Sequence, residues 1–258
     1  MLKRLAIIAA SAILGLGPAF AAETSQGEQG PAAAIPGEHP YKGVIELFTS
    51  QGCSSCPPAD ALIKTYAENR DVIALSYAVD YWDYLGWKDT LALPRNTERQ
   101  RAYAKARGDG AVYTPQAVVN GVKHVVGSSK EDIDKALEAG WPRFAKSQVP
   151  VRFWMQNGAL LIQTGAAAQG QQVKDATIWF LVVKKAVAVA IGRGENAAKS
   201  ITYANVVREI TPVGVWTGKP IMIRLAMHAV MRHDTEGAVV LIQQGEGGPI
   251  IGAAAMGL

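Results

Sequence analysis

The sequence predicts a mixed α/β protein in which an α/β domain, residues 41–145, is followed by a β-rich, sandwich-like unit, residues 146–258. Three observations predict this organisation. Apolar runs alternate with helical patterns as far as residue 140, and apolar β-runs separated by turns follow from residue 149. The third is the position of Cys53 and Cys56, the only two cysteines, between the first apolar run and the first helical pattern.

The N-terminus has the pattern of a cleaved signal peptide. Lys3 and Arg4 precede the apolar residues 5–16, and Ala19-Phe20-Ala21 supplies the small-x-small pattern of a cleavage site. The apolar stretch is shorter than the roughly 20 residues of a membrane-spanning helix. We therefore expect residues 1–21 to be removed, no membrane anchor, and a periplasmic or secreted protein.

Residues 22–40 are rich in Gly, Ala, Gln, Glu and Pro without hydrophobic periodicity, which predicts a disordered lead-in. The formal net charge of +4 falls to +2 without Lys3 and Arg4, and basic and acidic residues are interspersed. This distribution argues against a nucleic-acid-binding protein.

The first elements of the α/β domain surround the two cysteines. Residues 43–48 form a nearly continuous apolar run, typical of a buried strand. After the CxxC motif, apolar residues recur at helical spacing from Ala59 to Ala67, and Pro57-Pro58 suits the first turn of a helix. Residues 72–79 then predict a second strand.

An aromatic insert, residues 80–93, follows the second strand and fits neither the helical nor the strand period. Aromatic residues in such an insert are usually part of the hydrophobic core or shield it from solvent. The position of the insert after the second strand nevertheless places these residues near the expected site at the CxxC motif. We therefore interpret Trp82, Tyr84 and Trp87 as candidate substrate-binding residues.

Residues 97–107 predict a polar helix, capped by Asn96 or Thr97 and ended by Gly108. Two β-runs on either side of Asn120-Gly121 predict a hairpin. A capping box, Ser128 to Glu131, opens a helix that we expect to end at Gly140. This order of strand, CxxC, helix, strand, insert with helix, hairpin and helix is that of the thioredoxin fold.

The C-terminal β-runs are separated by glycine-rich turns. Their spacing predicts an antiparallel sandwich, and the alternative is an extension packed onto the first core. Trp141-Pro142 and the stretch to Pro150 mark the expected boundary. The glycine-rich residues 192–196 lack the context of a phosphate loop, and we interpret them as a turn.

A CxxC motif at the start of a helix suits thiol–disulfide exchange. Backbone N–H groups and the helix dipole there stabilise the first thiolate, which predicts Cys53 as the nucleophile and Cys56 as the resolving thiol. Such exchange needs no bound cofactor. Its partners would be protein thiols or disulfides and a second redox protein that resets the pair.

Glu46 is the one charged residue of the first predicted strand. A buried carboxyl group with a raised pKa would accept the proton of Cys56 during resolution. The alternative is an exposed residue at the end of a strand. We predict that Glu46 is the proton acceptor.

Thr114-Pro115 directly precedes the predicted hairpin. Thioredoxin-like folds place a cis proline there, opposite the CxxC motif, so that the backbone of the preceding residue pairs with an extended substrate. We therefore predict a cis peptide bond and assign Thr114 and Pro115 to the site.

A metal site is a competing interpretation of the cysteine spacing. The chain has no second CxxC, and its four histidines, His39, His124, His228 and His233, do not lie at ligand spacing beside the first. We expect no metal.

Four stretches resemble an uncharacterised family of secreted bacterial proteins with a thioredoxin-like domain. They are residues 46–60, containing CSSCPPAD; residues 79–89, VDYWDYLGWKD; residues 113–121; and residues 192–196 with 205–208. The resemblance implies the fold and export, but no substrate. A histidine is common in the family where this chain has Ala78.

The sequence thus predicts a periplasmic thiol–disulfide oxidoreductase that uses Cys53 and Cys56. The alternative is a non-catalytic binding protein with a structural Cys53–Cys56 disulfide. The dipeptide Ser54-Ser55 between the cysteines is compatible with both functions.

Overall fold

The computed structural model describes residues 23–25, 41–168, 174–231 and 234–258. Its elements are β1 (Glu23–Ser25), β2 (Gly43–Thr49), α1 (Pro57–Ala67), β3 (Val72–Ala78), the 3-10 helix η1 (Asp83–Leu85), α2 (Pro94–Arg107), β4 (Gln116–Val119), β5 (Lys123–Val126), α3 (Lys130–Ser147), β6 (Val151–Gln156), β7 (Ala159–Thr164), β8 (Ala176–Ala190), β9 (Ser200–Trp216), β10 (Ile221–Ala226), α4 (Met227–Val230), β11 (Gly237–Gln244) and β12 (Ile250–Met256). The predicted signal peptide, residues 1–21, lies outside the described residues.

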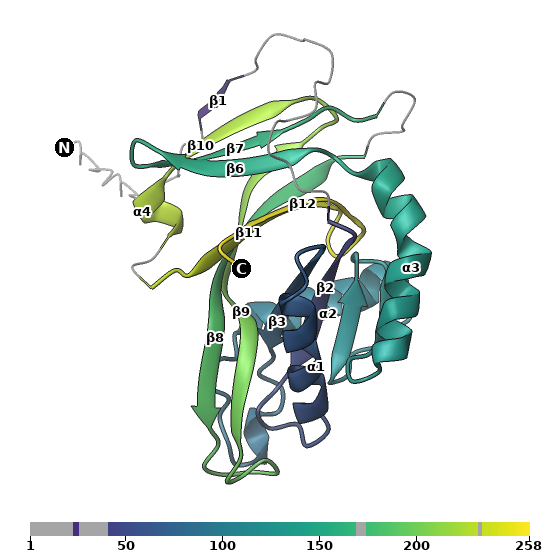
Figure 1. The fold of residues 1–258 in the computed structure, drawn as a ribbon, viewed down its shortest axis with the longest axis vertical. Helices are drawn as coiled ribbons and strands as arrows, with labels where there is room; N and C mark the ends of the chain where they lie inside the picture. The colour runs from purple at the N-terminus through teal and green to yellow at the C-terminus, as the bar shows by residue number, and fades with distance from the viewer. Residues whose placement is uncertain (1–22, 26–40, 169–173, 232–233) are drawn as a thin grey trace, which may run out of the picture.

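Two sheets organise the molecule (Figure 1). The large sheet has the strand order β12-β11-β8-β9-β3-β2-β4-β5 and is mixed, because β3 pairs in parallel with both β2 and β9 while the other pairings are antiparallel. The small sheet, β1-β10-β7-β6, is antiparallel throughout. The fold is therefore a mixed α/β fold with a large mixed sheet and a small antiparallel sheet.

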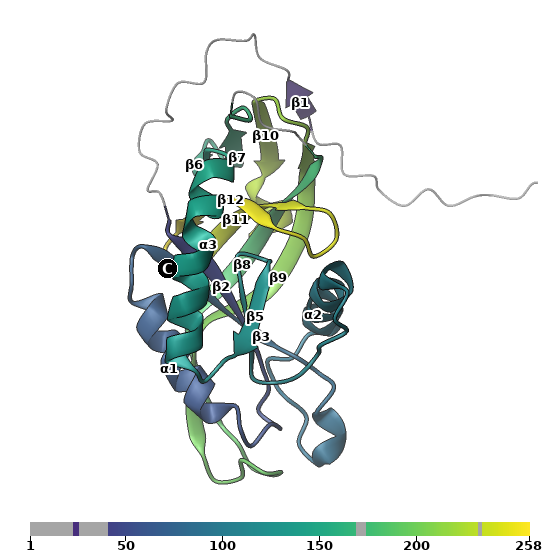
Figure 2. The ribbon, with the colours of Figure 1, turned by 90° about the vertical axis from the view of Figure 1, so that its right-hand side faces the viewer.

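The helices cover both faces of the N-terminal part of the large sheet (Figure 2). Ile45 and Leu47 of β2 pack with Ala59 and Ile63 of α1. Val44 and Phe48 pack on the other face, with Tyr103 of α2. Alternate residues of a strand point to opposite faces, so β2 is buried on both sides, as its apolar sequence predicts.

The C-terminal strands divide between the two sheets. β8, β9, β11 and β12 extend the large sheet, and one apolar core runs across it from Val118 of β4 to Ala253 of β12. Strands β6, β7 and β10 pack over β8, β11 and β12 through a second core. The small sheet thus packs on the C-terminal strands of the large sheet, and the large sheet continues from these strands into the N-terminal ones.

Local boundaries show which sequence signals hold. Gly108 ends α2 with a φ of 77°, as predicted, but α2 begins at Pro94, three residues before Thr97, because a proline fits the first turn. Ser129 caps α3 by accepting a hydrogen bond from the Asp132 backbone N–H. The predicted capping box is therefore displaced by one residue.

Two further predictions about chain boundaries differ from the structure. Helix α3 continues past Gly140 and contains Pro142, because Phe144 on its last turns is buried in the main core. Three residues of the expected lead-in, Glu23–Ser25, form β1 on the edge of the small sheet, where β10 offers backbone groups for pairing. The remainder of residues 22–40 lies outside the described residues.

Candidate functional site

Cys53 and Cys56 form a disulfide bond in the loop between β2 and α1. Cys56 directly precedes α1, and Pro57 and Pro58 occupy its first turn. Ser54 and Ser55 are exposed, whereas both cysteines have 0% of their surface exposed. The disulfide is therefore buried beneath its own loop and neighbouring side chains.

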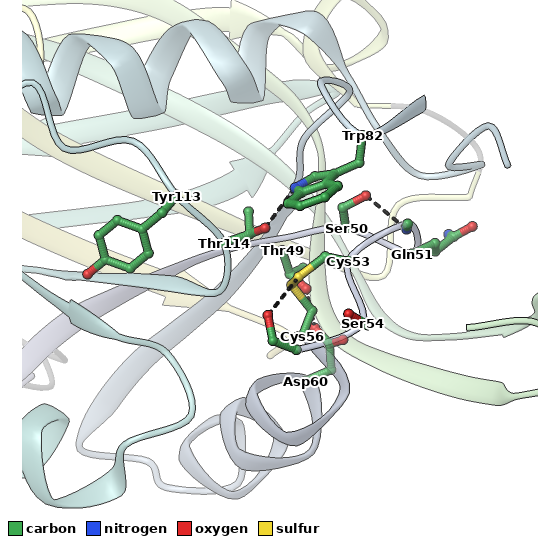
Figure 3. The surroundings of a disulfide bond; sticks show 12 residues. Thr49, Ser50, Gln51, Cys53, Ser54, Cys56, Asp60, Trp82, Tyr113 and Thr114 are labelled. Atoms are coloured by element: carbon green, nitrogen blue, oxygen red, sulfur yellow. Dashed lines mark hydrogen bonds between the residues drawn. A yellow bond between two sulfur atoms is a disulfide. The ribbon is translucent and has the colours of Figure 1, made fainter. Parts of the chain in front are cut away.

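Trp82 lies near the disulfide, with Thr114 beside its indole ring (Figure 3). Its indole N–H donates a hydrogen bond of 2.8 Å to Thr114 Oγ1. A Cβ atom at Gly52 would lie only 3.0 Å from Trp82 Cβ, so this position suits a glycine. Trp82, a predicted substrate-binding residue, thus lies beside the CxxC loop and contacts the residue before Pro115.

The Thr114-Pro115 peptide bond is cis, as predicted. Pro115 precedes β4, which pairs with β2, and its carbonyl accepts a hydrogen bond from the Gly127 backbone N–H. The structure therefore brings Thr114, Pro115 and the CxxC loop together from separate segments.

The other two aromatic candidates lie in different surroundings. The Trp87 indole N–H donates to Gln51 Oε1 at 2.8 Å, and the Gln51 backbone N–H donates to Asp89. Trp87 therefore holds the CxxC loop in place through the side chain of Gln51. Tyr84 is 78% exposed, and its role in substrate binding stays a prediction.

Glu46 lies on the face of β2 that carries Val44 and Phe48, opposite the face that packs on α1. It is fully buried and forms a two-point ion pair with Arg99, with nitrogen–oxygen distances of 2.7 Å and 3.2 Å. Tyr103 also donates its hydroxyl to Glu46. The carboxylate is thus fully engaged on the far side of the sheet from the disulfide.

Asp60 is a buried acid on the disulfide side of β2. It lies one helical turn after Cys56, and its backbone N–H donates to the Cys56 carbonyl (Figure 3). Its Oδ1 accepts a 2.7 Å hydrogen bond from the Thr49 hydroxyl. Its Oδ2 is buried and, among the described residues, has no hydrogen-bond partner.

Burial raises the pKa of Asp60 to about 7, with a further upward contribution from Asp89 and a downward one from the Thr49 hydrogen bond. The pKa of Tyr203, whose buried hydroxyl has no partner among the described residues, is raised by burial and by Asp60 and Asp89. Asp60 was not singled out from the sequence. The signal that could have found it is its spacing of four residues from Cys56, which places Asp60 and Cys56 on the same side of the helix.

The glycine-rich residues 192–196 do form a turn, at the tip of the β8–β9 hairpin, and this tip contacts the CxxC loop. Asn196 donates its side-chain N–H groups to the carbonyls of Gln51 and Cys53. Its amide is fully buried. No signal local to the CxxC motif could have identified this contact.

Within the described part of the chain, no cluster of three or more His, Cys, Asp or Glu residues is arranged to hold a metal ion. His124 lies instead beside Asp109 and Tyr113. Among the same residues, no helix combines the length and the apolar character needed to cross a membrane.

The fold and site define a mixed α/β protein with a buried CxxC disulfide at the start of a helix and a cis proline beside it. Residues 44–243 match the model of the family described as "Protein of unknown function (DUF1223)", and the chain belongs to this family. The family resemblance of the sequence is thus confirmed. No curated protein matches the chain.

Two solved structures are similar to this chain. Protein AGR_C_4864 from Agrobacterium tumefaciens is 36% identical with a TM-score of 0.75, over 85% of this chain and 95% of that one. HBP35 of Porphyromonas gingivalis is 14% identical with a TM-score of 0.57, over 86% of this chain and 76% of that one. The second likeness concerns the fold alone.

Proposed function

We propose that this protein is a thiol–disulfide oxidoreductase of the periplasm or extracellular space, with Cys53 as nucleophile and Cys56 as resolving thiol. The observation that carries the proposal is the CxxC disulfide at the start of α1, flanked by a cis proline and by the buried acid Asp60, one oxygen of which has no partner among the described residues. The order of elements from β2 to α3 supports the thioredoxin-like assignment of this part.

The exchange takes two steps. The Cys53 thiolate of the reduced pair attacks a substrate disulfide, forms a mixed disulfide, and releases one substrate sulfur as a thiolate, which takes a proton from water. The Cys56 thiolate then attacks Cys53 Sγ, closes the internal disulfide and releases the second substrate thiolate. Two electrons pass to the substrate, and a dithiol redox protein returns them to the pair.

Asp60 suits the proton transfer of the second step. A pKa of about 7 leaves a substantial fraction of its carboxyl ionised near neutral pH, so that it can accept the Cys56 proton. Its unpartnered oxygen is free to do so. We assign this role to Asp60 rather than to Glu46, which the sequence predicts, because Glu46 is paired with Arg99 on the other face.

Because both cysteines are buried, we expect the side chain of Trp82 to move before exchange begins. Trp82 is held by one side-chain hydrogen bond, to Thr114. Trp82→Ala should expose the disulfide and increase its reduction rate by a small thiol about tenfold, a change of about 1.4 kcal/mol in the barrier. Tyr84→Ala, at an exposed position of the same insert, is the control and should leave the rate unchanged.

The second candidate function is a binding protein with a structural disulfide, and the complete burial of both cysteines favours it. Equilibration with glutathione separates the two. A reduction potential between about −120 and −270 mV supports exchange, whereas one below about −300 mV indicates a structural bridge. Cys56→Ala should also retain partner proteins as mixed disulfides, and finding none would contradict the exchange function.

A further inference from the structure

The tip of the β8–β9 hairpin, residues 191–199, is built into the CxxC site from the C-terminal part of the chain. Backbone hydrogen bonds from Ile191 to Lys199 and from Ala198 to Ile191 close the tip on itself. Gly192 and Gly194 lie against Trp87, where added Cβ atoms would come within 3.2 Å and 3.3 Å of that side chain. The tip is therefore packed in place, not merely adjacent.

Asn196 connects the tip to the main chain of the CxxC loop. Its Nδ2 donates to the Gln51 carbonyl at 3.0 Å and to the Cys53 carbonyl at 2.8 Å, from 143 residues further along the chain than Cys53. Lys199 Nζ donates to Asn196 Oδ1 at 2.8 Å, which orients the amide with its N–H groups toward the loop. Both donors of one fully buried amide thus hold this loop.

Glu195 makes a second contact between the hairpin tip and the CxxC loop. Its Oε2 accepts a 3.3 Å hydrogen bond from the Ser54 backbone N–H, which directly follows Cys53. Glu195 thus engages the backbone N–H next to Cys53, three residues before α1 begins, and brings a carboxylate beside this cysteine. A like charge disfavours an ionised neighbour.

We propose that the hairpin tip tunes the redox pair, with Asn196 as a positioning residue for Cys53 and Glu195 as the residue that disfavours the Cys53 thiolate. This inference rests on the proposed exchange function and gives it a direction. Holding the two sulfurs together favours the disulfide, and destabilising the thiolate disfavours the reduced pair. The reduced Cys53–Cys56 pair therefore donates electrons, and its substrates are protein disulfides.

The test compares four purified variants of the full mature chain with the wild type. Each is equilibrated with glutathione, and the Cys53 thiol pKa is measured in the reduced protein by its rate of alkylation. Asn196→Ala should shift the equilibrium toward the dithiol about tenfold, which corresponds to about 30 mV for a two-electron couple. Glu195→Gln should shift it in the same direction about threefold and lower the thiol pKa.

Arg193→Gln is the matched control, because Arg193 is an exposed charged residue of the same tip. It should leave the glutathione equilibrium within about twofold. Asn196→Asp keeps the shape of the side chain but cannot donate, so it should fail to restore the wild-type equilibrium. If Asn196→Ala does not fold, the exposed Glu195→Gln still decides the outcome.

Two results would overturn different statements. Unchanged equilibria and thiol pKa in both Asn196→Ala and Glu195→Gln, with a wild-type protein that exchanges with glutathione, would overturn this inference alone. A wild-type potential below about −300 mV would instead remove the exchange function on which the inference rests.

Discussion

Two buried carboxyl groups lie on opposite faces of the sheet at β2, and their surroundings differ. Glu46 is satisfied by Arg99 and Tyr103 in the core against α2. Asp60, on the side of α1, has one hydrogen bond and one unpartnered oxygen among the described residues. A buried acid that is fully paired has its charge compensated, whereas one left short of partners has a raised pKa and is available for proton transfer.

The largest expected effect concerns the paired acid. Arg99→Met leaves the Glu46 carboxylate buried without its cation, which should lower the free energy of unfolding by about 3–5 kcal/mol. Urea unfolding of the oxidised protein measures this loss. Arg95→Met on the same helix is the control, since Arg95 is exposed and its guanidinium donates to the Ile210 carbonyl rather than to a buried carboxylate.

The double variant Glu46→Leu with Arg99→Met sharpens this prediction. Removing both charges should recover most of the lost stability, because no uncompensated buried charge remains. A double variant as unstable as Arg99→Met alone would show that the ion pair is not what distinguishes this side of the sheet.

The next effect concerns the kinetics of exchange. Asp60→Asn removes the proposed proton acceptor and should slow the resolution of the mixed disulfide about a hundredfold, the lower range for general acid–base catalysis. Rapid-quench trapping of the mixed disulfide with a disulfide-bonded peptide measures this step. If Glu46→Gln slows resolution instead and Asp60→Asn does not, the assignment of the two acids is reversed.

Asp60 should also make stability depend on pH. Its pKa is raised to about 7 in the folded protein, above an unfolded value of about 3.9. Between these values the folded state binds the extra proton, so the free energy of unfolding falls as the pH rises. From about pH 5 to about pH 8 we expect a loss of about 2–3 kcal/mol.

This pH-dependent loss should be absent from Asp60→Asn, measured by urea unfolding with the disulfide intact. Glu46→Gln should retain it, because Asp60 is unchanged in that variant. A wild-type protein of constant stability across this range would contradict the raised pKa of Asp60.

The smallest effect concerns the one hydrogen bond of Asp60. Thr49→Val should cost about 1 kcal/mol of stability. Because this hydrogen bond lowers the pKa of Asp60, its loss should also move the pH-dependent transition upward. Thr65→Val on the exposed side of α1 serves as the control, and an unshifted transition in Thr49→Val would contradict the contact.

Local patterns of the sequence determined the elements around the disulfide. The two prolines after Cys56 predict a helix start, Gly108 a helix end, and Thr114-Pro115 the cis bond, and each is present. These features depend on the backbone preferences of a few adjacent residues. Local patterns predict the exact ends of helices less accurately, as the displacement of the α3 cap from Ser128 to Ser129 shows.

Tertiary structure decided which buried acid is free and which distant segments complete the site. The sequence indicated that Glu46 is buried, but only the packing of β2 shows that it faces Arg99 and not the disulfide. Asn196 reaches Cys53 only because β8 and β9 extend the large sheet as far as the CxxC loop. Such contacts depend on how strands pair across the sheet, and the residues that make them carry no local pattern that specifies their partners.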